Sequence, residues 1–285
     1  MIPNVDILIP CSLDEAVRRL ESMDAAVPLA GGTELIPSMR AGKKAPDSLI
    51  ALDGLNLAYI SSRQDAVELG AMTTMSQILA SSELRTGPLS LLQKAISQAA
   101  SWQIRNAATI GGSLASGIPG LDPITALLAL DARVRLISGG GCREVPVSAF
   151  FPAPMKTVLQ KGELILSVIL PRPEEGDWRV WFRKVGIRKA YTMLIVNMAS
   201  MLLLEDGMIR SWRLAAGGVS PVSLLLDRTA GQAVGKRLDE VDPEQLKRCL
   251  QQEISPEPAG GAEYKRILCG NLLCEILEDG RKMRE

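Results

Sequence analysis

Two short segments of the chain pair glycines with hydroxyl side chains, a combination suited to binding an anion. Residues 30–34 read AGGTE, and residues 109–113 read TIGGS. Glycine permits positive φ angles and a close approach of the backbone to another group. We expect both glycine pairs to expose backbone N–H groups, which form concave nests for phosphate oxygens. One glycine pair is usually only a turn, but two of them could clamp one extended ligand.

The two loops do not match the better-known phosphate-binding motifs. Neither reads G-x-G-x-x-G or G-x-x-x-x-G-K-[ST], so a classical Rossmann fold and a P-loop are excluded. A third segment, SGIPGLDP over residues 116–123, ends in Asp122 ahead of an apolar run. A carboxylate there is commonly the N-cap of a helix, and it is also placed to contact a ligand.

The composition lacks the residues of common side-chain catalysis, so we expect a bound cofactor to carry any chemistry. The 285 residues include no histidine, which excludes Ser-His-Asp and Cys-His nucleophiles and the usual proton shuttle. The 32 basic and 32 acidic residues cancel, which argues against a nucleic-acid partner. An odd number of cysteines without a C-x-x-C pair predicts free buried thiols in a reducing compartment and no metal site. These cysteines are Cys11, Cys142, Cys249, Cys269 and Cys274.

The apolar pattern predicts mixed helices and strands that position these loops. Ser12 followed by Glu15 is typical of a capping box that opens a helix over 12–23. Further helices are predicted over 89–100, after Asp122, and over 242–254 and 262–280. Strands are predicted over 48–52, 66–72, 178–186 and within 192–219.

The proline-bearing, charged segment 171–177 indicates a boundary between two domains. The longest apolar run, Met193–Leu204, is too short to span a bilayer and contains Asn197. The first ten residues lack a basic n-region. We therefore expect a cytoplasmic protein without a membrane partner.

Four segments resemble, in order, one known family. They are PLAGGTELIPSMR (28–40), IRNAATIGGSLASGIPGLDPITALLALDARVRL (104–136), AAGGVSPVSLLLDRTA (215–230) and AEYKRILCGNLLCEIL (262–277). On these residues the chain is identified as a member of the FAD-binding medium subunits of the molybdenum hydroxylases. That family includes subunits of xanthine dehydrogenase and aerobic carbon monoxide dehydrogenase.

The resemblance implies an α+β fold of the vanillyl-alcohol-oxidase (PCMH) type. Residues 1–173 would form the FAD-binding domain, with subdomains of about 1–55 and 56–173. Residues 174–285 would form a C-terminal α+β domain with an antiparallel sheet. FAD would lie extended between the two subdomains, with its pyrophosphate over both glycine loops.

The resemblance also implies a set of cofactor-binding residues. The first loop would contribute Ala30, Gly31, Gly32, Thr33, Glu34, Leu35 and Ile36. The second would contribute Thr109, Gly111, Gly112, Ser113 and Ser116. The remaining residues would be Asp122, at the ribityl or adenosine side, Ile165, Lys184 and Tyr191.

Two of these residues keep an alternative interpretation, and two positions depart from the family pattern. Lys184 would approach the flavin, or it is a solvated strand lysine. Tyr191 would cover the isoalloxazine, or it is a core aromatic. Thr192 stands where the family has an acidic residue. This departure concerns the binding of the nicotinamide and not the retention of FAD. The turn before Asp122 lacks the polar residue common in relatives.

The implied activity is electron relay without a catalytic side chain. A molybdopterin-containing large subunit would oxidise the substrate, a [2Fe-2S] small subunit would carry electrons, and FAD would deliver them to NAD or another acceptor. One alternative is a stand-alone FAD oxidoreductase of the same superfamily, which needs a proton donor that the sequence does not display. The other alternative is a scaffold without flavin, against which the two intact glycine loops argue.

Overall fold

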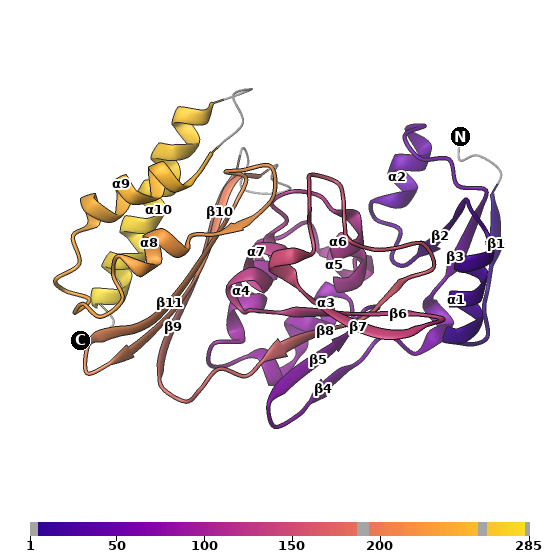
Figure 1. Ribbon diagram of the computed structural model, residues 1–285, viewed down its shortest axis with the longest axis horizontal. Helices are drawn as coiled ribbons and strands as arrows, with labels where there is room; N and C mark the ends of the chain where they lie inside the picture. The colour runs from indigo at the N-terminus through magenta and orange to yellow at the C-terminus, as the bar shows by residue number, and fades with distance from the viewer. Residues whose placement is uncertain (1–4, 187–193, 256–260, 283–285) are drawn as a thin grey trace. The chain divides into compact units, whose positions relative to one another are not determined.

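The computed structural model describes residues 5–186, 194–255 and 261–282, and Figure 1 shows the order of their elements. The chain divides into two compact units built from interleaved segments. Unit 1 comprises Met1–Ser81, Ser101–Gly117 and Arg133–Leu170. Unit 2 comprises Ser82–Ala100, Ile118–Ala132 and Pro171–Glu285. The domain division at residue 173 stays a prediction.

The first sheet of unit 1 is parallel, with the order β1-β3-β2. Its strands are β1 (Asp6–Leu8), β2 (Ala26–Leu29) and β3 (Ser48–Ala51). Helix α1 (Leu13–Ser22) connects β1 to β2 and packs Ala16, Val17 and Leu20 against Ile50 of β3. Ser12 caps this helix by accepting a hydrogen bond from the backbone N–H of Glu15 at 3.2 Å, which confirms the predicted start. Helix α2 (Leu35–Arg40) follows the first glycine loop.

The second sheet of unit 1 has the order β4-β5-β8-β6-β7. Its strands are β4 (Ile60–Ser62), β5 (Ala66–Gly70), β6 (Arg133–Ser138), β7 (Gly141–Pro146) and β8 (Leu164–Pro171). Strand β4 pairs with β5, and β6 pairs with β7 and β8, all in antiparallel fashion. Besides α1 and α2, the described helical elements of this unit are η1 (Asp53–Leu55), α3 (Met75–Ala80), α5 (Trp102–Ala107), α6 (Ile110–Ser116) and η3 (Val147–Ala149). The second predicted glycine loop, residues 109–113, forms the N-cap and the first turn of α6.

Unit 2 is a four-stranded antiparallel sheet covered by helices on both faces (Figure 1). Its strands, in the order β12-β11-β10-β9, are β9 (Asp177–Gly186), β10 (Leu194–Glu205), β11 (Met208–Gly217) and β12 (Leu224–Leu225). The C-terminal helices on one face are α8 (Asp227–Gly231), α9 (Pro243–Glu253) and α10 (Ala262–Lys282). Helices α4 (Ser90–Ser97) and α7 (Asp122–Ala129) pack on the other, and η2 (Ser82–Leu84) precedes α4. The predicted antiparallel sheet is confirmed.

Strand β10 explains why the longest apolar run of the sequence is continuous. Successive side chains of a strand point to opposite faces, and both faces of this sheet are covered. Val196, Met198 and Leu202 join the core beneath α9 and α10. Asn197 therefore points to the face that α7 covers, where it is fully buried. Within the described residues, no helix is long and apolar enough to cross a membrane.

The cysteines are free thiols, but they are not all buried as expected. Cys269 is buried in α10, and burial raises the pKa of its thiol to about 12. Cys11 and Cys142 are exposed. Cys11 lies in the turn before α1, and Cys142 lies on β7, which is an edge strand with an exposed face. The number of cysteines carries no information about such local positions, so the prediction of buried thiols is wrong for these two residues.

Candidate functional site

The two glycine loops lie against each other in unit 1. A Cβ added at Gly31 would stand 1.8 Å from the carbonyl oxygen of Ala107, just before the second loop. A Cβ added at Gly112 would stand 3.8 Å from the Cβ of Ala30. The backbone of the first loop thus approaches the second more closely than any side chain would allow. Tertiary packing brings together the two segments that the sequence keeps apart.

The first loop presents a run of unused N–H donors. Gly32 has a φ of 66°, the left-handed conformation that glycine tolerates best. Within the described part of the chain, the backbone N–H groups of Gly31, Gly32, Thr33 and Glu34 donate no hydrogen bond. Thr33 is exposed and its three neighbours are partly exposed. Successive N–H groups in such a turn form a nest that fits an anion such as a pyrophosphate.

The helix that follows fixes this loop to the core. Leu35, the first residue of α2, is buried with Met39 against Leu49 of β3, and Ile36 packs at the margin of the same cluster. An apolar residue directly after the nest therefore anchors the loop without taking up its donors.

The carboxylate of Glu34 is engaged beside the nest. It accepts hydrogen bonds from the Ser38 hydroxyl at 2.7 Å and from the Lys44 ammonium at 3.1 Å. Burial raises the pKa of this carboxyl, but Ser38 and Lys44 outweigh burial and the pKa is lowered overall. Glu34 therefore stays charged and is balanced by Lys44, while its backbone N–H has no hydrogen-bond partner among the described residues.

The second loop uses its N–H groups inside the protein, contrary to the expectation from the sequence. The Gly111 N–H donates to the carbonyl of Ala71 at 2.9 Å, and a Cβ on Gly111 would lie 2.7 Å from that oxygen. The Gly112 N–H donates to Oγ1 of Thr109 at 3.0 Å, which caps α6. A helix start satisfies its first N–H groups with its cap residue, and this local rule overrides the predicted second nest.

Gly112 nevertheless leaves space for a ligand. A Cβ at this position would meet only Thr109 Oγ1, at 2.9 Å, and Ala30 within 4 Å. The glycine therefore opens one side of the loop next to Ala30 of the first loop. Ser113 and Ser116 are partly exposed on α6, and the Ser116 hydroxyl donates to the Ser113 carbonyl at 2.8 Å.

Of two further residues expected at the site, Ile165 and Tyr191, the structure describes only Ile165. Ile165 is buried in β8 and pairs with Leu136 of β6, so it belongs to the core of unit 1. Tyr191 and the neighbouring Thr192 lie outside the described residues.

Asp122 and Lys184 form a buried ion pair in unit 2. Oδ2 of Asp122 accepts a hydrogen bond from Lys184 Nζ at 2.5 Å, and Oδ1 accepts one from Nδ2 of Asn197 at 2.7 Å. Leu121 is the N-cap residue of α7, and Asp122 is the first residue of the helix without a capping bond. The interpretation of Asp122 as the N-cap is therefore wrong. Lys184 is only 10% exposed, so the solvated-lysine interpretation is wrong as well.

Burial dominates the electrostatics of Asp122. It raises the pKa of the carboxyl, and the hydrogen bond and charge of Lys184 offset this effect only in part. In the sequence, Asn197 stands out only as a polar interruption of the apolar run 193–204. An amide in a strand that is buried on both faces must have hydrogen-bond partners. This requirement was the sequence signal that Asn197 bonds to other buried polar groups.

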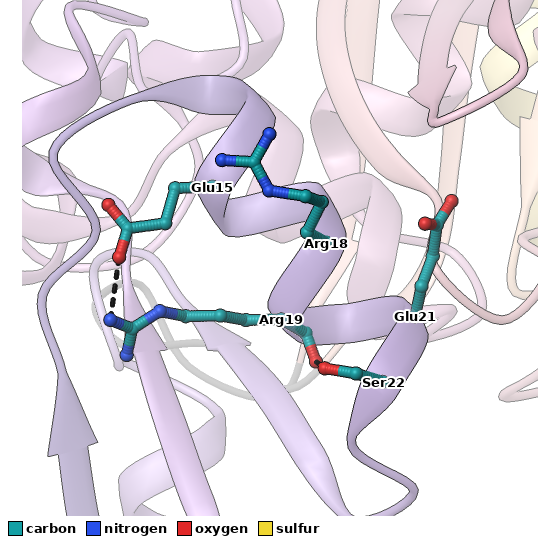
Figure 2. A pocket seen from close by; sticks show the side chains of 5 residues that line it. All are labelled: Glu15, Arg18, Arg19, Glu21 and Ser22. Atoms are coloured by element: carbon teal, nitrogen blue, oxygen red, sulfur yellow. Dashed lines mark hydrogen bonds and ion pairs between the residues drawn. The ribbon is translucent and has the colours of Figure 1, made fainter.

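A hollow beside helix α1 is separate from these residues. Glu15, Arg18, Arg19, Glu21 and Ser22 of α1 line about 470 Å³ of open space. Figure 2 shows these side chains and the ion pair between Arg19 and Glu15, at 2.6 Å. All of them come from one helix and include no residue of the glycine loops. The hollow therefore has no part in the site.

Comparison with known families identifies the fold and the cofactor. A family model described as the FAD binding domain in molybdopterin dehydrogenase matches residues 3–173. A second model, the CO dehydrogenase flavoprotein C-terminal domain, matches residues 181–279. The chain belongs to the FAD-binding medium subunits of the molybdenum hydroxylases. The predicted family and the FAD cofactor are confirmed, and the chain is an oxidoreductase subunit.

Relatives of known function cover nearly the whole chain. The glyceraldehyde dehydrogenase medium chain of Sulfolobus acidocaldarius is 30% identical, over 90% of each chain. The carbon monoxide dehydrogenase medium chain of Hydrogenophaga pseudoflava is 28% identical, over 96% of each. The xanthine dehydrogenase FAD-binding subunit of Escherichia coli O157:H7 is 27% identical, over 94% of this chain and 93% of the relative.

Solved structures give the same result. A crystal structure of the Cu,Mo-CO dehydrogenase superposes with a TM-score of 0.91 at 28% identity, over 98% of each chain. The carbon monoxide dehydrogenase of Hydrogenophaga pseudoflava that lacks the Mo-pyranopterin moiety superposes with a TM-score of 0.90 at 26% identity, over 96% of each. The predicted α+β fold of the PCMH type with an antiparallel C-terminal sheet is confirmed.

Proposed function

We propose that this subunit relays electrons within a molybdenum hydroxylase complex, from iron–sulfur centres through FAD to NAD or another acceptor. Its partners are a molybdopterin-containing large subunit and a [2Fe-2S] small subunit. The observation that carries the proposal is the nest of free N–H groups at residues 31–34, packed beside the open side of Gly112. Relatives named as the medium chains of two different dehydrogenases, and as the FAD-subunit of a third, support the multi-subunit assembly, but they differ in the substrate that they are named for.

The cofactor contacts follow from the donors that remain. The N–H groups of Gly31, Gly32, Thr33 and Glu34 would hold the pyrophosphate of FAD, and Ala30, Leu35 and Ile36 would shape that loop. In the second loop, the Gly112 N–H already donates to Thr109. Gly112 would therefore contribute only the space that its missing side chain leaves for the cofactor. The other residues of this set are Thr109, Gly111, Ser113, Ser116 and Ile165. Asp122, Lys184 and Tyr191 complete the proposed set.

The protein's own task is to bind and orient the cofactor. Bound FAD supplies the ability to accept electrons singly and to pass them on in pairs. The N–H nest neutralises phosphate charge, and the pair of Asp122 and Lys184 keeps one negative and one positive group fixed in a buried place. None of these tasks requires a side chain to transfer a proton, which agrees with the absence of histidine.

Substitution of Gly112 by valine tests the placement of the second loop. A β-branched side chain fills the open side of Gly112, so we expect Gly112→Val to lower FAD affinity by about a hundredfold or more, roughly 2.7 kcal/mol. Titration of the apoprotein with FAD, followed by flavin fluorescence, measures this loss. Gly54→Val is the control, because nothing lies within 4 Å of an added Cβ there. Normal FAD affinity in a folded Gly112→Val protein contradicts the proposed loop.

Reconstitution tests the relay. The isolated chain should carry FAD without a covalent bond, since neither glycine loop holds a histidine or cysteine. It should oxidise no purine, aldehyde or carbon monoxide until the molybdenum and iron–sulfur subunits are added. Substrate-dependent bleaching of the flavin absorbance then appears. Bleaching by the isolated chain would instead identify a stand-alone oxidoreductase.

A further inference from the structure

Three residues on neighbouring strands form a row beneath the start of α7. Asn197 of β10 is the cross-strand partner of Lys184 on β9 and of Gly217 on β11. Cross-strand partners point to the same face of a sheet. Asn197 donates to the carbonyl of Gly120 at 3.0 Å and to the carboxylate of Asp122 at 2.7 Å. The strand register thus places this amide under the turn that carries Asp122.

The orientation of the Asn197 amide is fixed by its partners. Both N–H bonds go to acceptors, Gly120 and Asp122, and the amide oxygen accepts from Thr125 Oγ1 at 2.9 Å. A flipped amide would set its oxygen against two other oxygens. Asn197 and Thr125 are both fully buried, so water does not replace a lost partner easily.

The first glycine of the segment AAGGV makes room for this arrangement. A Cβ on Gly217 would lie 2.4 Å from Oδ1 of Asn197 and 2.7 Å from Oγ1 of Thr125. Any side chain at residue 217 would displace the amide or the hydroxyl. The glycine therefore preserves the contact between β10 and α7.

The other end of α7 is held by the same sheet. The Arg213 guanidinium of β11 donates to the carbonyls of Ala129 at 2.7 Å and Leu128 at 3.1 Å, and it pairs with Asp131 at 3.0 Å. These carbonyls lie at the C-terminal end of the helix, where a cation is favourable. Helix α7 is thus fixed by Asn197 at its start and by Arg213 at its end.

We propose that Asn197, oriented by Thr125, is a positioning residue that fixes the Asp122 carboxylate and, through it, the Lys184 ammonium for contact with FAD. This inference rests on the proposed roles of Asp122 and Lys184. A carboxylate has about four acceptor sites and an ammonium has three donors. Each carboxylate oxygen of Asp122 accepts one hydrogen bond, from Lys184 or from Asn197. Among the described residues, the Lys184 ammonium donates to Asp122 and, at 3.5 Å, to the carbonyl of Gln98, so both groups keep capacity for a ligand. A buried ion pair with few other partners contributes little net stability, because its charges are costly to desolvate.

The experiment uses the full chain and FAD titration of four variants. Asp122→Ala and Asn197→Ala should each weaken FAD binding about tenfold, the size of one lost buried hydrogen bond to a charged group. Thr125→Val should weaken it about threefold, and Thr125→Ser should restore the affinity, because serine keeps the hydroxyl donor. If Asn197→Ala fails to fold, Thr125→Val and Thr125→Ser carry the test.

Ser200→Ala is the matched control. Ser200 lies three residues further along β10, is fully buried, and accepts from Trp212 Nε1 at 2.8 Å on the opposite face of the sheet. Its loss should lower the melting temperature and leave FAD affinity within about twofold, since a structural defect alone does not reach Asp122. Asn197→Ala should add no further loss in the Asp122→Ala background, because it acts through that carboxylate.

The midpoint potential of the bound flavin is a second readout. Without the hydrogen bond from Asn197, the Asp122 carboxylate is less stable in its charged form and neutralises the charge of Lys184 less completely. The remaining positive charge favours the reduced cofactor, which is the more negative form. We expect the potential to rise in Asn197→Ala, by about 30 mV if reduced FAD is favoured tenfold. The inference is overturned if Asn197→Ala behaves like Ser200→Ala while Asp122→Ala loses affinity. Unchanged affinity in Asp122→Ala would overturn both the proposed role of Asp122 and this inference.

Discussion

Glu68 in unit 1 and Asp122 in unit 2 are both buried carboxylates, but their hydrogen-bond partners differ in number. Glu68 on β5 of unit 1 is 3% exposed, and Asp122 in unit 2 is 5% exposed. Asp122 has two donors, the ammonium of Lys184 and the amide of Asn197. Glu68 has four. They are Ser167 at 2.7 Å, Arg135 at 2.8 Å, Tyr59 at 3.1 Å and Arg63 at 2.7 Å.

The number of donors decides the charge state that each site favours. Burial raises the pKa of both carboxyls. For Glu68 the bonds from Ser167 and Tyr59 and the charge of Arg135 outweigh burial, so its pKa is lowered overall. For Asp122 burial prevails, and the pKa is raised. A fully satisfied carboxylate stabilises a fold, whereas a partly satisfied one retains acceptor capacity for a ligand.

The largest effect should come from removing one arginine of the Glu68 cluster. Arg135→Met leaves the buried carboxylate short of a charged partner, so we expect the free energy of unfolding to fall by about 3 kcal/mol. Urea denaturation measures it. Arg133→Met is the control from the same strand, because Arg133 is 46% exposed and its ion pair in the described part of the chain is with Glu144. The cost of this substitution should stay under about 1 kcal/mol. Equal losses in both variants would remove the distinction between the two arginines.

The pH dependence of stability should have opposite signs for the two carboxylates. A lowered pKa at Glu68 means that the unfolded chain binds protons first, so stability is lost as pH falls below about 4.3. A raised pKa at Asp122 means that the folded chain binds a proton first, so stability is gained as pH falls from neutral toward about 3.9. Glu68→Gln should therefore flatten the loss on acidification, and Asp122→Asn should steepen it.

Unfolding free energies of the three proteins, measured between pH 7 and pH 3.5, test these signs. The wild type serves as the reference for each variant. The comparison fails if both variants change the acid dependence in the same direction.

The smallest effect is expected at an exposed carboxylate. Lys44 pairs with Glu34 at 3.1 Å, and their side chains are 43% and 29% exposed. Lys44→Ala should change the free energy of unfolding by less than about 0.5 kcal/mol, because water screens the pair. FAD affinity should also be unchanged, since the nest uses backbone N–H groups. A clear loss of FAD affinity would show that the charge of Lys44 itself contributes to the anion site.

Local features were predictable because short-range rules determine them. Ser12 caps α1 as expected, and Asp242 caps α9 by accepting from the Glu244 N–H at 3.0 Å. The alternation and length of the apolar runs indicated the helices and the long strands of unit 2. The two glycine loops were recognised for the same reason, since a glycine pair next to a threonine is a feature of a few consecutive residues.

The sequence by itself therefore determined the elements, the loops and the family. Only the tertiary structure decided which polar groups remain available. The Gly112 N–H donates to Thr109, whereas the Gly31 N–H donates no hydrogen bond to a described residue. Asp122 accepts hydrogen bonds from Lys184 and Asn197 and does not cap its helix. The reason is that the partner of a buried polar group is chosen by strand register and close backbone approach. Both depend on residues far away in the chain, such as Gly217 beneath α7 and Ala107 against Gly31.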